Sequence, residues 1–137
     1  MSQENVEAVR AALTRYRVPM DPGDVDALVE AFDPQGEAVD PPDLPGATTH
    51  RGHDAIRRAV ESLPRFWVDW RMEADEVASV GNDRVFAHGR AFGRGRASGV
   101  EVVRPFQLVA VLKDGRLMQV RYFESRNEAL EAAGLRE

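Results

Sequence analysis

Residues 39–53 read Val-Asp-Pro-Pro-Asp-Leu-Pro-Gly-Ala-Thr-Thr-His-Arg-Gly-His, and they indicate where the first strand ends. Its prolines, Pro41, Pro42 and Pro45, cannot donate backbone hydrogen bonds and favour extended geometry in the residues before them. We therefore predict that a strand ends near Asp40 and that a rigid loop follows. A carboxylate at a strand end beneath a stiff loop is a candidate general acid or base.

Two helices and a short strand are predicted upstream of this stretch. Apolar residues at spacings of three and four form one stripe on a first helix that Ser2 could cap: Val6, Val9, Leu13 and Tyr16. The segment Pro19 to Gly23 breaks this helix, and Asp24 is predicted to cap a second one. The inner side of the second helix carries Ala27, Leu28, Ala31 and Phe32. Residues 36–39 then form the strand that leads to Asp40.

Downstream, one more helix is followed by a change of period. A third helix is predicted from His53 or Asp54 to Pro64, with its buried stripe formed by Ile56, Ala59, Val60 and Leu63. From Phe66 onward polar and apolar residues alternate, which predicts an antiparallel meander with strands near 84–92, 100–112 and 117–124 and turns at 81–83 and 113–115. Residues 125–128 form a capping box for a last helix that stops at Gly134.

Helices placed ahead of a curved antiparallel sheet define an α+β fold in which the helices pack on the concave face of the sheet. The length of 137 residues fits a single domain, residues 1–137. The absence of cysteine excludes disulfides and thiol catalysis, and the net charge of −5 argues against nucleic acid as a partner. Without a signal peptide or a long apolar run, we expect a cytoplasmic protein that does not enter a membrane.

The order of elements and several short motifs resemble a known superfamily. The motifs are Gly23-Asp24-Val25-Asp26-Ala27-Leu28, the loop 40–53, Lys113-Asp114-Gly115-Arg116 and the segment 128–135. Over nearly the whole chain they look like the SnoaL-like branch of the nuclear transport factor 2-like superfamily. The resemblance implies a cone-shaped, half-open barrel with a deep pocket, commonly dimeric through its sheet. The superfamily includes isomerases, cyclases, epoxide hydrolases and non-catalytic binding domains, so it predicts fold better than function.

Ketosteroid isomerase is the nearest catalytic comparison, with an aspartate base and two donors that stabilise an enolate. The resemblance matches Asp40 to the aspartate that shuttles the proton and Tyr16 to the tyrosine that faces the substrate oxygen. The third position falls at about Leu108, which cannot donate a hydrogen bond. This departure argues against steroid isomerisation itself.

His88 is the residue predicted to replace the missing donor. On the resemblance, Phe86, His88 and Arg90 share the pocket face of their strand, and a neutral imidazole there could polarise a carbonyl. The rest of the predicted substrate-binding wall is Phe32, Leu108, Met118, Val120 and Tyr122. The structural alternatives are that Asp40 caps a turn, that Tyr16 is a core aromatic and that His88 only makes hydrogen bonds.

Two classes of function follow from these residues. The first is an isomerase, cyclase or hydrolase without metal or cofactor, in which Asp40 is the general base, Tyr16 an oxyanion donor and His88 an assistant. The second is a non-catalytic ligand-binding or interaction domain. Either would take a small hydrophobic molecule, and a homodimer is expected through Val109, Val111, Leu117 and Phe123 on the other sheet face. A metal site built from His50, His53, Asp40 and Asp43 is a weaker alternative.

Overall fold

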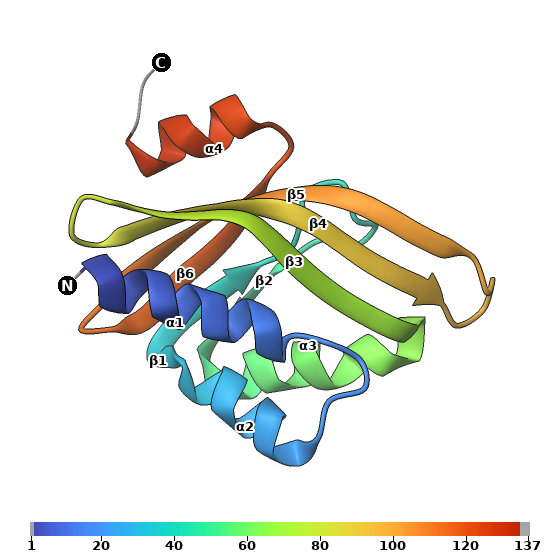
Figure 1. Cartoon of the computed structure of the whole chain (residues 1–137). Helices are drawn as coiled ribbons and strands as arrows, with labels where there is room; N and C mark the ends of the chain where they lie inside the picture. The colour runs from blue at the N-terminus through green and yellow to red at the C-terminus, as the bar shows by residue number, and fades with distance from the viewer. Residues whose placement is uncertain (1, 135–137) are drawn as a thin grey trace.

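A computed structural model describes residues 2–134 of the chain, and Figure 1 shows the arrangement. Its elements are α1 (Ser2–Arg15), α2 (Pro22–Glu30), β1 (Phe32–Val39), β2 (Thr49–Arg51), α3 (Gly52–Phe66), β3 (Trp67–Val80), β4 (Arg84–Gly95), β5 (Glu101–Lys113), β6 (Arg116–Phe123) and α4 (Arg126–Ala133). One sheet contains all six strands in the order β2-β1-β6-β5-β4-β3. Only the β1–β6 pair is parallel among the pairs of these described strands.

The sheet is curled but not closed, and helices lie on both of its sides (Figure 1). Helices α1, α2 and α3 cover one side, which we call the inner face, while α4 lies on the outer face. Side chains alternate between the two faces along a strand. In β4, Val85 and Ala87 join the inner core, whereas Phe86 between them joins the outer one. The predicted α+β class with a half-open, curled sheet is confirmed.

The inner core holds the fold together because three helices bury their apolar stripes on it. Each helix contributes buried residues: Val9 and Leu13 from α1, Leu28 and Val29 from α2, and Ile56 and Val60 from α3. They pack against Leu108, Ala110, Leu112 and Leu117 of the sheet. Buried aliphatic side chains of this size each stabilise a fold by roughly 1.5–3 kcal/mol. No helix within residues 2–134 is long and apolar enough to cross a membrane.

Several local predictions need correction. Asp21, not Asp24, caps α2, because the side chain of Asp21 accepts the backbone N–H of Asp24 at 2.8 Å. Phe32 opens β1 instead of ending α2, although its side chain is buried in the inner core. Pro64 lies inside the last turn of α3, which continues to Phe66. The stretch expected to be one loop contains β2, which pairs with β1.

The outer face is also partly covered, which the prediction of helices on the concave side did not include. Ser125 caps α4 as predicted, and Gly134 ends the helix in the left-handed region at φ 94°. Ala129, Leu130 and Ala133 of α4 pack on Phe86 and Val109.

The residues expected on a free dimer face are therefore not available together. Val109 and Phe123 lie in the cluster under α4, and Leu117 belongs to the inner core, 1% exposed. The bulge between Val111 and Leu112 explains the error for Leu117, because an extra residue in one strand reverses the alternation beyond it.

Candidate functional site

Asp40 follows the last residue of β1, and both oxygens of its carboxylate have partners from the β2 side of the loop. Oδ1 lies 3.0 Å from Nε2 of His50, and Oδ2 accepts the backbone N–H of Thr48 at 3.2 Å. The backbone N–H of Asp40 donates in turn to the Thr48 carbonyl at 3.0 Å. The Asp40 side chain is 31% exposed and that of His50 23%, so the pair is accessible to a ligand but well positioned.

The sequence predicts a role for His50 only in the alternative metal site, whereas its pairing with Asp40 comes from the β1–β2 register. Ala38 pairs with His50, which brings the histidine beside Asp40, two positions further along the chain. The signal available in the sequence was the β-branched pair Thr48-Thr49 after the proline-rich loop, which is typical of a returning strand.

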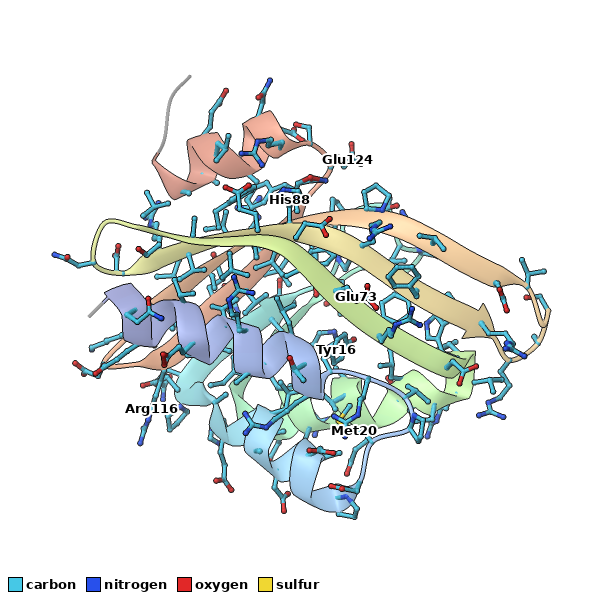
Figure 2. The ribbon with its side chains drawn as sticks, viewed as in Figure 1. Tyr16, Met20, Glu73, His88, Arg116 and Glu124 are labelled. Atoms are coloured by element: carbon cyan, nitrogen blue, oxygen red, sulfur yellow. The ribbon has the colours of Figure 1, made fainter. Side chains whose placement is uncertain are left out.

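Two tyrosines lie near this pair on the inner face, and Figure 2 shows Tyr16 between the sheet and the helices. Burial raises the pKa of Tyr16 to about 12, and the negative charge of Asp40 adds to the effect. Burial likewise raises the pKa of Tyr122, with further contributions from Tyr16 and Asp40. The Tyr122 hydroxyl donates to Sδ of Met72 at 3.9 Å. Both phenols therefore stay protonated at neutral pH and can act as hydrogen-bond donors.

A direct prediction concerns the ionisation of these phenols, since Tyr16 and Tyr122 are the only two tyrosines of the chain. Neither should ionise in the folded protein near pH 10, where free tyrosine does. The phenols of the unfolded chain lose their protons at a lower pH than those of the folded protein. The free energy of unfolding should therefore fall as the pH rises from about 10 toward 12. Ultraviolet titration at the tyrosinate band measures this. Ionisation of both tyrosines near pH 10 in the folded protein would contradict the burial, and the denatured protein is the control.

The remaining predicted wall residues divide between the two sides of the sheet. Phe32, Leu108, Val120 and Tyr122 belong to the inner core cluster. Leu108 pairs directly with Tyr122 across β5 and β6. The bulge in the β5–β6 pairing leaves Met118 without a cross-strand partner between Leu117 and Gln119. Met118 is partly buried and lies outside both described core clusters, so its predicted place in the wall is not supported.

Phe86, His88 and Arg90 lie on the outer face, so their predicted place in the cone is wrong. Figure 2 shows His88 on the α4 side of the sheet and Tyr16 on the opposite side. Phe86 is 1% exposed under α4, and the Arg90 guanidinium lies 5.5 Å from the ring of Phe92. The physical cause is the period of two along a strand, because an alignment shifted by one residue turns every side chain to the other face.

His88 has a partner of its own on the outer face. Its Nε2 lies 3.2 Å from Oε1 of Glu76, and Arg126 of α4 donates to the same oxygen at 2.8 Å. The hydrogen bond from Arg126 lowers the pKa of Glu76, and the charges of Arg126 and His88 act in the same direction. This cluster attaches the start of α4 to the sheet, which is a structural role for His88.

Of the four residues of the alternative metal site, only Asp40 and His50 are brought together. His53 donates through Nε2 to the Phe32 carbonyl at 2.7 Å, and Asp43 accepts from Arg104. Within residues 2–134, no three His, Asp or Glu side chains are grouped as metal ligands.

Two cavities lie at opposite ends of the sheet, and the first of them is lined by Asp40, Tyr122 and residues of α4. One of about 610 Å³ opens beside Asp40 and Tyr122 and extends toward α4; its lining residues are Val39, Asp40, Pro42, Arg121, Tyr122, Phe123, Glu124, Glu128, Glu131 and Ala132. A second of about 780 Å³ lies at the other end of the sheet, where Val18, Met20, Trp70 and Val102 contribute apolar surface. A positioned carboxylate that lines a cavity can contact a small molecule and accept a proton from it.

The fold is that of solved nuclear transport factor 2-like proteins. Residues 6–120 match the family model of the SnoaL-like domain, and the chain belongs to that family. No curated protein matches the sequence.

Solved structures support the same fold. A nuclear transport factor 2-like protein of unknown function from Burkholderia pseudomallei has a TM-score of 0.77 at 19% identity, with 96% of this chain and 97% of that chain covered. A protein named as a SnoaL-like polyketide cyclase from Jannaschia has a TM-score of 0.75 at 20% identity, covering 96% and 92%. A protein with a ketosteroid isomerase-like fold from Catenulispora acidiphila, in complex with trimethylamine, has a TM-score of 0.71 at 18% identity, covering 99% and 96%.

Proposed function

We propose that this SnoaL-like domain binds a small, largely apolar carbonyl compound and catalyses proton transfer on it, as an isomerase, cyclase or hydrolase that needs no metal. Asp40 takes a proton from the carbon next to the carbonyl in an isomerase or cyclase, or from the attacking water in a hydrolase, and returns it to the product or the leaving group. The carbonyl oxygen, on which negative charge develops, accepts hydrogen bonds from Tyr16 and Tyr122. His50 holds the carboxylate in position. The single observation that carries the proposal is this pairing of Asp40 with His50 at 3.0 Å beside two protonated phenols.

The hydroxyl of Tyr122 can replace the hydrogen-bond donor that Leu108 lacks. The two residues face each other across neighbouring strands, so a hydroxyl on Tyr122 can serve the region that a donor at position 108 would serve. An apolar substrate body suits the inner face, where Leu108, Val120 and Met72 are the neighbours of the phenols. One relative of the same fold is named as a polyketide cyclase, and polyketide-like carbonyl compounds are accordingly the first substrates to test.

Solvent exchange tests the proposal without knowledge of the natural substrate. We expect the protein to catalyse replacement of the acidic hydrogens of cyclic and aromatic ketones by deuterium in heavy water, followed by proton NMR. The control is the Tyr16→Phe and Tyr122→Phe double variant, in which the base remains but the hydroxyl donors are gone. A wild-type protein that accelerates no exchange across a broad panel of ketones would argue against a general base at Asp40.

The second candidate is a binding domain without chemistry. The observation that favours it is that Leu108 is apolar and that His50 and Thr48 already occupy both oxygens of Asp40. Native mass spectrometry of protein purified from its own host distinguishes the two. A ligand recovered unchanged after long incubation supports the binding domain, whereas conversion of the ligand supports the enzyme.

We also propose a homodimer through the part of the outer face that α4 leaves uncovered. Phe92 and Val103 pair there, Val103 is 59% exposed, and the guanidinium of Arg71 lies 4.2 Å from the Phe92 ring. Burying such a row against a second copy removes apolar surface from water. Analytical ultracentrifugation should show a dimer at micromolar concentration, and Val103→Arg should yield monomers because it adds a like charge beside Arg71. A monomeric wild-type protein would contradict this.

A further inference from the structure

Arg104 is a cation on an otherwise uncharged part of the inner face. It pairs with Ala91, which lies in the inner core, and Phe106 and Leu108 follow it on the same face of β5. By the same alternation, the other residues that the described strands β4, β5 and β6 turn to this face are uncharged. A guanidinium at the edge of an apolar surface is the arrangement that recognises an anion at one end of an apolar molecule.

The present partner of Arg104 is a carboxylate from the loop that begins at Asp40. Nη2 of Arg104 donates to Oδ2 of Asp43. Backbone bonds within the loop are local, from Leu44 to the Pro41 carbonyl and from Ala47 to the Leu44 carbonyl. The side chains of Arg104 and Asp43 are 53% and 40% exposed, so water and solutes reach the pair. An exposed ion pair contributes little to stability, and another carboxylate can replace Asp43 at small cost.

The row of inner-face residues that contains Arg104 ends beside the hydroxyl of Tyr122. Met72, Ala91 and Arg104 form one row across β3, β4 and β5, and the Tyr122 hydroxyl contacts Met72 at the far end of that row. Two strand spacings separate the ends of the row, roughly 10 Å. Phe106 and Ala91, each 6% exposed, are the apolar core residues between them.

We propose that Arg104 is the anion-recognition residue of the cone. It binds the carboxylate of an apolar carboxylic acid whose carbonyl end reaches Tyr16 and Tyr122. When no ligand is bound, the Arg104 guanidinium pairs with Asp43. The inference rests on the proposed function, since it names the ligand class of the same site. Arginine suits this role because its planar fork matches the two oxygens of a carboxylate.

Two variants that break the same ion pair should have opposite effects on binding. Asp43→Asn removes the competing carboxylate and should tighten the binding of aromatic acids about fivefold or more, whereas Arg104→Gln should weaken it about tenfold or more. The probes are benzoate, 2-naphthoate and 4-phenylbutanoate, each with its primary amide, measured by isothermal titration calorimetry. The amides should bind all three proteins equally, because they have no charge for Arg104 to bind.

Matched variants at the β5–β6 turn control for the overall charge of the protein. Asp114→Asn and Arg116→Gln make the same chemical changes away from the loop and should leave the affinity for the acids unchanged. The proposal is wrong if Asp43→Asn and Arg104→Gln change the affinity for the acids in the same direction. It is also wrong if the affinities for acids and amides change equally, or if neither the wild type nor Asp43→Asn binds any of the acids.

The outcome is separable from that of the proposed function. Opposite effects on the acids without any hydrogen exchange would leave the anion site in place and remove the catalysis. Catalysed hydrogen exchange on neutral ketones, without opposite effects of the two variants on acid binding, would support the catalysis and rule out the anion site.

Discussion

Replacing Asp40 with asparagine is expected to reduce the rate of catalysed hydrogen exchange by about 10²- to 10⁴-fold, which is the usual contribution of a positioned general base. Such a loss corresponds to about 3–5 kcal/mol of transition-state stabilisation. The amide cannot accept a proton at neutral pH, whereas its oxygen still accepts the N–H of Thr48, so the loop should keep its conformation. NMR exchange rates measured at saturating ketone give the comparison.

The control for this variant is Asp114→Asn. Asp114 lies in the β5–β6 turn at φ 52°, a left-handed conformation that asparagine also adopts readily. The substitution makes the same chemical change far from the inner face. The Asp114→Asn variant should therefore catalyse exchange of ketone hydrogens at the wild-type rate. If Asp40→Asn retains full activity with an unchanged melting temperature, Asp40 is not the base.

The largest effect on stability is expected from Gly89→Ala. A Cβ atom at this position of β4 would lie 2.0 Å from the Glu73 carbonyl oxygen and 2.7 Å from Cα of Ala74. Both are backbone atoms of β3 next to the irregularity between Ala74 and Glu76, so the strands would have to separate. We expect a loss of about 3 kcal/mol or more, as in overpacked cores. Thermal and urea unfolding of the purified variant measure it.

Gly95→Ala is the matched control in the same strand. Its Cβ would meet Oγ of Ser98 at 2.6 Å, which is the end of a short side chain that can rotate away. The loss there should stay below about 1 kcal/mol. Equal unfolding midpoints for Gly89→Ala and wild type would show that β3 and β4 are not packed as closely as described.

The sequence predicted the fold well because its signals are local. Helical spacing in residues 6–16 and 56–63, the alternation after Phe66, and the cap at Ser125 depend on neighbouring residues, and each led to the element that the structure contains. Proline chemistry likewise placed the end of β1 beside Asp40. The errors at Asp24 and Phe32 are shifts of a few residues at helix ends, where the same residue types suit several positions.

Two residues of the candidate site, Asp40 and Tyr16, could be predicted from the sequence, whereas the placement of the histidines could not. Asp40 and Tyr16 could be named because a resemblance matched both positions, and the structure brings them close enough for the charge of one to raise the pKa of the other. His88 was misplaced because the face of a strand depends on its register, and an offset of one residue against a relative reverses it. His50 was missed because its contact with Asp40 arises from the pairing of β1 with β2 across a loop.

Three features could be predicted without the structure: the α+β class, the order of helices and strands, and a carboxylate at the end of a strand. These follow from propensities and periods that act over a few residues. Which residues meet, such as Asp40 with His50 and Arg104 with Asp43, depends on the three-dimensional fold. The physical reason is that strand register and the curl of the sheet join residues tens of positions apart, and both are fixed by packing of the whole domain and not by any local pattern.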